Sequence, residues 1–363
     1  MRRISTNRTE ALFVAVLGLL SLTCSASPGE DHPIGSGVST PAFPGALGWG
    51  KNTTGGRGGE VRRVTNLNDK GIGSLRVALQ TAGAAYVIFE VAGTINLQSG
   101  LNISSDKTIA GETAFRNGGE GITLKINQGT TSNTLVTVSG SSNIICRFLR
   151  LRRGPGLAPE VDGDCLLLTG SGTDFIFDHC SFSWIGNGSD EVTFYNNLFA
   201  HNNQRNPLVG GGVGGGTKFE LVNNLIYNFG YFGTVFSDNN TPVRVNFINN
   251  YHLAGPKTAT SRYPIAINKG VTAYARGNIN SKRPSEKDPE WNAIGLESGG
   301  VKYMEEPAPT AWQSETPFDY PLQKIATMSA TEIRNRVIAN AGANLVKDAV
   351  DQRIFADVLG RTG

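Results

Sequence analysis

Short runs of alternating apolar and polar residues, each containing a polar pair, recur through the middle of the chain. The clearest copies read "IFDHCSFSW", "TFYNNLFAHN", "FELVNNLIYNFG" and "VNFINNYHLAG". Clusters of Gly, Asn, Ser and Asp separate the runs, and helical periodicity is absent from this region. Alternation bounded by turn residues is typical of short strands. The pattern therefore predicts a repeating, all-β domain.

The spacing of the copies distinguishes between two repeat architectures. Intervals of 31, 18, 27, 26 and 28 residues separate the matching positions, which are Phe148, His179, Asn197, Asn224, Asn250 and Asn278. A propeller blade needs four strands and about 40 residues, so these intervals are too short for one. An Asn at each bend of a solenoid tolerates left-handed backbone and can bond to the Asn above and below. The repeats therefore favour a parallel β-helix.

The two ends of the repeat region carry helix and loop signals. "GSLRVALQTAG" predicts a short helix capped by Ser74 and ended by Gly83, which would close the N-terminal end of the solenoid. After about residue 300 the chain becomes Pro-rich, and "SATEIRNRVIANAGA" predicts a capped helix. We expect this tail to pack along the outside of the β-helix.

The first residues have the order of a secretory signal peptide. Three arginines precede the apolar run "ALFVAVLGLLSLT" and the small residues "CSAS", and the run is too short to span a bilayer. We expect cleavage near Ala26 and a secreted protein, extracellular or periplasmic; Cys24 could alternatively carry a lipid. The expected organisation is a signal peptide at 1–25, a β-helix domain at 26–300 and a packed C-terminal extension at 301–363.

Composition and charge bear on the class of partner and on the state of the cysteines. The net charge is only +3 over 363 residues and no Lys/Arg-rich run occurs, which argues against a nucleic-acid partner. The three cysteines that follow the signal peptide, Cys146, Cys165 and Cys180, lie among apolar residues. We expect buried thiols and no disulfide framework.

Two carboxylates in "EVDGDCLLL" suggest a cation site. Asp162 and Asp164 are two residues apart at the start of a predicted strand, so their side chains point to the same side. Adjacent carboxylates repel unless one is protonated or a cation lies between them, and oxygen ligands favour calcium. A solvated turn rich in Asp is the alternative.

An arginine and two histidines complete the polar candidates. Arg205 lies in "HNNQRNP" just before a Gly-rich loop, where it could bind carboxylates or pair with a neighbouring coil. We expect structural roles for His179 and His201 at repeat positions. Asp162, Asp164 and Asp178 could also form a hydrolase-like acid cluster.

Together these segments resemble the pectate lyases of polysaccharide lyase family 1. The resemblance includes "AFPGALGWGKNTTGGRGGEVRRVTNLND", "TIAGETA", "DFIFDHCSFSW", "NNLFAHNNQRNP" and "GANLVKDAVDQRIFADVLGRTG". It implies a right-handed, single-stranded parallel β-helix that binds Ca²⁺ and cleaves polygalacturonate, an acidic plant cell-wall polysaccharide, by β-elimination. Arg205 matches the base of the family's Arg-x-Pro motif, and Asp162 and Asp164 match its first calcium ligands. We expect a monomer that binds neither nucleic acid nor membrane.

The chain departs from the family pattern after "SFSW". The interval of 18 residues from His179 to Asn197 is shorter than one expected coil, so one or two coils of the family are missing. "SDE" is retained, which makes Asp190 a further candidate calcium ligand, but no counterpart of the substrate-binding lysine is present. The alternatives are therefore an impaired β-helix that binds acidic polysaccharide without cutting it, and a pectin-type glycoside hydrolase.

Overall fold

The computed structural model describes residues 40–126, 134–153, 164–182, 185–186, 190–210, 217–238, 241–297, 305–318 and 328–363. Residues 40–363 form one compact unit. The signal-peptide segment, Cys24 and Asp162 lie outside the described residues. No helix among the described residues is long and apolar enough to cross a membrane.

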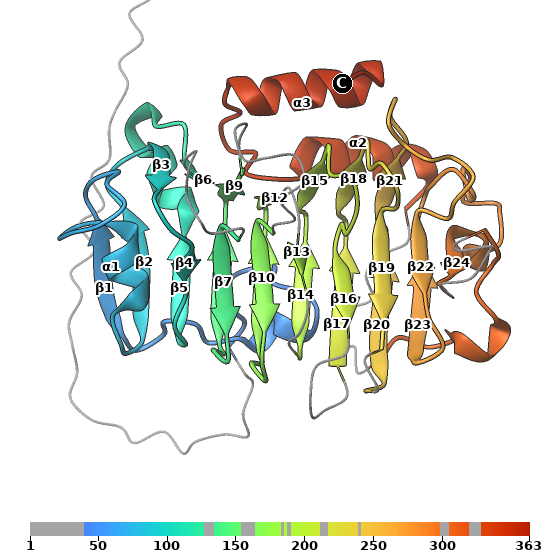
Figure 1. Ribbon diagram of the computed structural model, residues 1–363, viewed down its shortest axis with the longest axis horizontal. Helices are drawn as coiled ribbons and strands as arrows, with labels where there is room; N and C mark the ends of the chain where they lie inside the picture. The colour runs from blue at the N-terminus through green and yellow to red at the C-terminus, as the bar shows by residue number, and fades with distance from the viewer. Residues whose placement is uncertain are drawn as a thin grey trace, which may run out of the picture. The chain divides into compact units, whose positions relative to one another are not determined.

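The strands coil into a parallel β-helix with three faces (Figure 1). Every pairing between named strands is parallel, and each strand pairs with its equivalents in the preceding and following turns. This confirms the predicted architecture. It arises because the short apolar strands bury one set of side chains inside the coil, as in the buried-intermediate alternation of Ala85–Phe89.

We name the faces sheets A, B, C and D. Sheet A has ten strands: β1 (Glu60–Val64), β2 (Ala85–Phe89), β5 (Lys107–Ala110), β8 (Ile144–Arg147), β11 (Phe175–Asp178), β14 (Val192–Tyr195), β17 (Thr217–Val222), β20 (Val243–Ile248), β23 (Val271–Arg276) and β25 (Gln313–Ser314). Sheet B has seven: β3 (Gly93–Leu97), β6 (Ile122–Ile126), β9 (Leu149–Leu151), β12 (Ser181–Phe182), β15 (Leu198–Ala200), β18 (Leu225–Tyr227) and β21 (Tyr251–Leu253).

The third face consists of two four-stranded sheets. Sheet C contains β4 (Leu101–Asn102), β7 (Val136–Ser139), β10 (Leu166–Thr169) and β13 (Ile185–Gly186). Sheet D contains β16 (Leu208–Gly210), β19 (Thr234–Ser237), β22 (Ile265–Ile267) and β24 (Ile294–Leu296). β13 contacts β16, so sheet D continues the face that sheet C begins.

Two consecutive residues form the bend from sheet A to sheet B, and each has a different role. The first has left-handed backbone, with φ of 54° at Asn196 and 56° at Asn223. The second forms the predicted ladder: Asn197 Nδ2 donates to Asn224 Oδ1 at 3.1 Å, and Asn224 Nδ2 donates to Asn250 Oδ1 at 2.9 Å. The repeated Asn pairs therefore serve two needs, since one Asn tolerates αL and the other satisfies buried backbone groups.

The 18-residue interval holds a complete turn, so the expectation that it was too short is wrong. The register pairs Phe175 of β11 with Val192 of β14, 17 residues later, and β12 and β13 lie between them in the chain. The turn closes because β12 and β13 have only two residues each. His179 is therefore equivalent to Asn196, not to Asn197.

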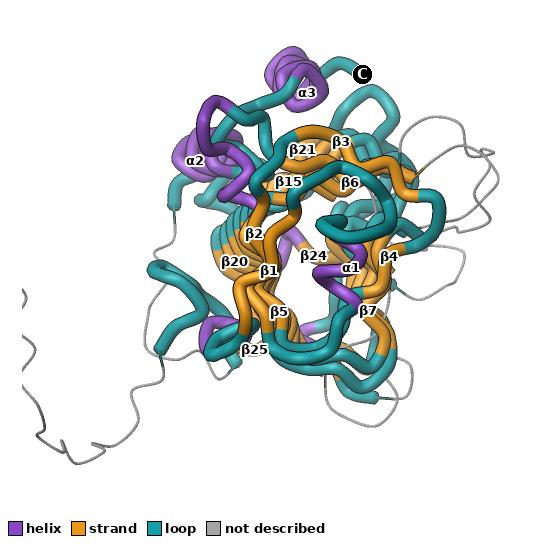
Figure 2. Tube along the Cα trace, turned by 90° about the vertical axis from the view of Figure 1, so that its left-hand side faces the viewer, coloured by secondary structure: helices purple, strands orange, loops and turns teal. Residues whose placement is uncertain are grey.

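Helices cover the N-terminal end and the outside of the coil. α1 (Leu75–Gln80) is capped by Ser74, whose hydroxyl accepts from Val77 N–H, as predicted. α2 (Ala330–Asn340) begins with a capping box from Ser329 and Glu332, again as predicted. α3 (Ala349–Gly360) was not predicted and begins at Asp348. Figure 2 shows α2 and α3 outside the coil, with α3 over sheet B.

Short 3-10 helices occur in the connections: η1 (Trp49–Asn52), η2 (Gly111–Gly118), η3 (Glu290–Ala293) and η4 (Thr310–Trp312). The segment around η1 crosses the outer face of sheet A. Gly50 N–H donates to Thr193 Oγ1 at 3.0 Å, and Gly56 N–H donates to Thr108 Oγ1 at 2.9 Å. A Cβ at Gly56 would lie 2.0 Å from the Ala85 carbonyl oxygen, so the close crossing requires glycine.

The interior is apolar and contains stacked aromatic rings. Phe177 of β11 stacks on Phe194 of β14 with centroids 5.4 Å apart. Cys146, Cys165 and Cys180 are buried thiols, as expected.

Candidate functional site

Arg205 lies in the loop between β15 and β16, at the edge where sheet D strands begin. Its backbone is left-handed with φ of 66°, and the residue is half-buried. The next residue, Asn206, is buried. The loop therefore fixes the place of Arg205 through its own backbone and through Asn206.

Asn206 is held by hydrogen bonds from its own loop and from the next coil. Its N–H donates to the Gly233 carbonyl at 2.7 Å, and its carbonyl accepts from Thr234 Oγ1 at 2.5 Å. Asn202 Nδ2 donates to its side-chain oxygen at 2.5 Å. Three separate contacts to one residue leave the backbone beside Arg205 little freedom.

A buried histidine contacts the Thr234 hydroxyl that binds the Asn206 carbonyl. His252 Nε2 lies 2.8 Å from Thr234 Oγ1, and complete burial lowers the pKa of His252 to about 3. The neutral ring must donate here, because the single hydroxyl proton of Thr234 goes to the Asn206 carbonyl. The sequence did not reveal these contacts, since Thr234 and His252 come from the coil after Arg205.

Asp164 lies at the same edge as Arg205. It is half-buried and lies two residues before sheet C strand β10, and its carbonyl accepts from Leu135 N–H at 2.9 Å. One strand, β13, separates β10 from β16, so two strand steps of about 4.8 Å put the two positions roughly 10 Å apart along the coil. The structure therefore brings Asp164 and Arg205 to one edge of the third face.

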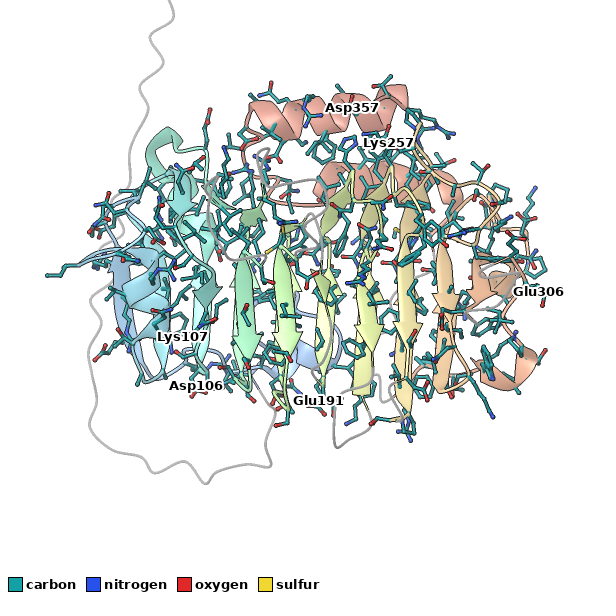
Figure 3. The ribbon with its side chains drawn as sticks, in the orientation of Figure 1. Asp106, Lys107, Glu191, Lys257, Glu306 and Asp357 are labelled. Carbon is teal, nitrogen blue, oxygen red and sulfur yellow. The ribbon has the colours of Figure 1, made fainter. Side chains whose placement is uncertain are left out.

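Asp190 lies at the opposite edge, where β13 has ended and β14 begins. Its N–H donates to the Gly172 carbonyl, beyond the end of β10, at 3.0 Å. Its carboxylate accepts from Lys218 N–H at 2.6 Å and Glu191 N–H at 2.9 Å, while burial raises its pKa. Figure 3 labels the adjacent Glu191 at the edge away from α3. The structure does not bring Asp190 to Asp164.

The remaining polar candidates have structural contacts. Asp178 is fully buried and pairs with Arg147 at 2.8 Å and His179 at 2.7 Å, and it belongs to sheet A, on a different face from Asp164. His179 stacks on Phe148 with centroids 4.8 Å apart. His201 contacts Asn228 Nδ2 at 3.0 Å, and burial lowers its pKa. The acid cluster of the hydrolase alternative is not assembled by the described residues.

Of the expected calcium ligands, only Asp164 lies among the described residues at the edge of Arg205. No group of three or more His, Cys, Asp or Glu side chains suited to a metal occurs among the described residues. Asp164 contributes carboxylate oxygens, the ligand type that calcium prefers. Its expected companion Asp162 lies outside the described part of the chain.

Comparisons with known proteins give close sequence relatives and a fold match. The chain is 32% identical to "Probable pectate lyase C" of Emericella nidulans over 88% of this chain and 76% of the relative. It is 25% identical to "Probable pectate lyase 6" of Arabidopsis thaliana over 75% and 65%. The crystal structure of jun a 1, the major allergen from cedar pollen, superposes with a TM-score of 0.54 at 19% identity, over 82% of this chain and 92% of that one, which shows a common fold. No family model matches the chain.

The Emericella relative is also longer than this chain within the aligned region. The alignment has 366 positions, although it includes only 88% of a chain of 363 residues. The relative therefore contains residues for which this chain has no counterpart.

Proposed function

The chain belongs to the pectate lyase family, polysaccharide lyase family 1, and on that premise we propose that it cleaves (1→4)-α-D-galacturonan by calcium-dependent β-elimination. The products would be 4,5-unsaturated oligogalacturonides. The observation that carries this proposal is the position of Arg205, which lies in a tightly held loop at the same edge as Asp164.

Asp162 and Asp164 are the residues that would hold the calcium ion, with a uronate carboxylate of the substrate beside it. Carboxylate oxygens are the ligand type that calcium prefers, and these two residues would supply part of its usual six to eight oxygen ligands. Bound calcium supplies electron withdrawal from the uronate carboxylate, which makes the C5 proton more acidic. Asp190 lies at the other edge, so we leave it out of this ligand set.

Arg205 is the proposed base. The side chain, in its neutral guanidine form, takes the proton from C5 and becomes guanidinium. The C5–H electron pair becomes the C4=C5 double bond, the bond from C4 to the glycosidic oxygen breaks, and the leaving oxygen takes a proton from water. The support for this role is the Arg205-Asn206-Pro207 sequence, which matches the family's motif, together with the contacts that hold Asn206.

An assay with polygalacturonate separates the three candidate functions. Ultraviolet absorbance of the unsaturated product that disappears with chelator and returns with calcium is the expected result. New reducing ends without absorbance would instead identify a hydrolase. Binding without either signal would identify a protein that recognises the polysaccharide but does not cleave it.

Replacing Arg205 tests the base directly. Arg205→Lys keeps the charge but loses the planar guanidinium and moves the donors, so we expect kcat to fall at least about 100-fold with KM little changed. Arg334→Lys, at an exposed residue on α2, is the matched control and should leave turnover unchanged. A folded Arg205→Lys variant with full turnover would rule out the assignment.

A binding protein without activity is the second candidate. The short turn between β11 and β14 favours it, because a groove built across several coils loses contacts when one is shortened. Lengthening this turn to match the relatives should restore cleavage if the shortening is the cause.

We further propose that the chain is secreted and monomeric. The support for secretion is the charged, apolar and small-residue order at the start of the sequence. N-terminal sequencing of exported protein should begin near Ala26, and light scattering should give the mass of one chain.

A further inference from the structure

A second groove lies outside the proposed reaction site, between the outer face of sheet B and helix α3. Its volume is about 700 Å³, and its walls come from β3, β6, β9, β12 and β15 together with α3. We call it the sheet-B groove. It begins at Thr94 on β3 and ends at Asn203, within the loop that also carries Arg205. Figure 2 shows α3 over sheet B, along the side of the coil where this groove lies.

The groove is elongated along the axis of the coil. Its walls span five successive strands of sheet B, which is four strand steps of about 4.8 Å, or roughly 19 Å. One wall is a hydrogen-bonded sheet. The other is held by the ion pair between Arg150 on β9 and Asp351 on α3 at 2.6 Å, with both side chains buried. A long groove with two fixed walls suits an extended chain better than a compact ligand.

Its lining is strongly cationic. The charged residues among the lining are Lys125, Arg152, Arg153, Arg353 and a single carboxylate, Asp348. That is a net charge of +3 with histidine neutral, equal to the net charge of the whole chain. The lining therefore presents a net positive charge to a ligand in the groove.

The internal ion pairs leave part of this charge available. Asp348 is bound by Arg152 at 2.6 Å. Lys125 forms no ion pair with any residue that the structure describes. Arg353 pairs with Asp357 at 3.1 Å, but its side chain is 60% exposed, so this pair contributes little. Lys125 and Arg353 therefore present cations from opposite walls.

A cavity of the same size elsewhere provides a contrast. It has about 720 Å³ and lies against sheet A and the C-terminal turns. Its charged lining residues are Arg276, Arg283, Glu286, Glu290 and Glu315, a net charge of −1. Volume alone does not distinguish the two cavities, whereas charge selects the sheet-B groove for an anion.

The uncharged lining fits sugar hydroxyls. Thr94 and Asn96 on β3, Thr123 on β6 and Ser181 on β12 supply hydroxyl and amide groups along the groove. Such groups both donate and accept hydrogen bonds, as sugar hydroxyls do. A ligand with regularly spaced carboxylates and hydroxyls would meet both kinds of partner.

We propose that the sheet-B groove binds a stretch of anionic polysaccharide, a chain of uronic acid residues, separately from the reaction site. The identity of the sugar rests on the proposed function, but the binding itself does not require cleavage. The groove would hold the polymer against the enzyme between cleavage events, because its end lies in the loop of Arg205.

Calorimetric binding of polygalacturonate in the presence of chelator tests the proposal, since the calcium-dependent reaction site is then silent. We expect saturable binding that weakens with added salt. Replacing both Lys125→Gln and Arg353→Gln should weaken it at least about tenfold, because two cationic contacts are lost. Arg276→Gln in the contrasting cavity is the matched control and should bind like the unaltered protein.

Several outcomes would overturn the groove assignment. No binding in chelator, or unchanged binding by the double variant with an unaltered thermal transition, would do so. Equal affinity for fully methyl-esterified pectin would show that the carboxylates of the ligand play no part in binding. Tighter binding of single-stranded DNA would show that the groove does not select a polysaccharide. If binding persists but no unsaturated product forms under any condition, the proposed function is wrong, whereas the assignment of the groove as a binding site is retained.

Discussion

Glu220, on β17, is a carboxyl group almost without access to water. Its exposed fraction is 1%, and its oxygens accept from Trp49 N–H and from Asn246 Nδ2, the latter at 2.8 Å. Burial raises its pKa from 4.5 to about 8. Trp49 belongs to the N-terminal segment that crosses sheet A, so this single residue couples the docking of that segment to pH.

The sign of the coupling follows from the raised pKa. The folded state holds the proton more tightly than the unfolded state, so the stabilisation is complete below about pH 4.5 and is lost as pH rises to about 8. Glu220→Gln removes this titration. Urea unfolding across that range should show that the variant gains stability relative to the unaltered protein by up to about 1.4 kcal/mol per pH unit. Parallel curves for the two proteins would contradict the assignment.

Thr234 illustrates how one hydroxyl can position a reactive neighbour. Thr234→Val keeps the shape but leaves the Asn206 carbonyl and His252 Nε2 without their partner. We expect a stability loss of about 1–3 kcal/mol and a several-fold lower kcat with little change in KM, because Arg205 loses its position.

Thr234→Ser should restore kcat, since it returns the hydroxyl. Thr272→Val, at a half-buried position on β23, serves as the control. If Thr234→Val lowers stability but leaves kcat intact, Thr234 supports the fold alone.

At the scale of elements, the Asn ladder joins successive coils at their sharpest bend. Asn224 is fully buried; its Oδ1 accepts from Asn197 N–H at 2.9 Å, and its Nδ2 donates to the Phe194 carbonyl at 2.9 Å. Each bond satisfies a backbone group that a two-residue bend cannot pair otherwise. The ladder is therefore part of how consecutive strands keep their register.

Removing one rung should be costly. Asn224→Ala leaves several buried polar groups without partners, and we expect about 3 kcal/mol or more of destabilisation in urea unfolding. Asn335→Ala, on the exposed face of α2, should change stability by less than about 0.5 kcal/mol. Equal effects of the two substitutions would show that the ladder contributes nothing specific.

At the scale of the whole β-helix, its C-terminal helices are docked by both apolar packing and charge. Ile333 and Val337 of α2 and Phe355 of α3 belong to one buried cluster with Leu225 and Tyr227 of sheet B. Arg150, with no exposed surface, reaches Asp351 on α3. Residues about 200 positions apart in sequence thus meet inside one interface.

Breaking the Arg150–Asp351 ion pair should weaken the docking of α3 on the β-helix. Asp351→Asn leaves buried Arg150 with only the more distant carboxylate of Asp348, at 3.6 Å, as its counter-charge. We expect about 3 kcal/mol of destabilisation, with earlier proteolytic cleavage between the β-helix and α3. Glu315→Gln, at an exposed carboxylate, is the control. A variant that unfolds and resists protease like the unaltered protein would mean that the apolar cluster alone holds α3.

The sequence by itself determined the architecture, because each coil repeats the same local signals. Alternating apolar residues and the repeated Asn pairs specify strands and bends, and Ser74 and Ser329 mark helix starts through local hydrogen bonds. The motif around Arg205 was also readable, since its residues are contiguous. The length of the shortest coil was misjudged, because two-residue strands at β12 and β13 leave no periodic signal.

Only the tertiary structure decided which residues share a face. The opposite placement of Asp190 and Asp164 depends on where β13 lies within its turn. The support of Arg205 by Thr234 and His252, and the cationic groove between sheet B and α3, join side chains from different coils. Their proximity follows from the stacking of coils and the docking of the tail, and separations of tens to hundreds of residues leave no local pattern to read.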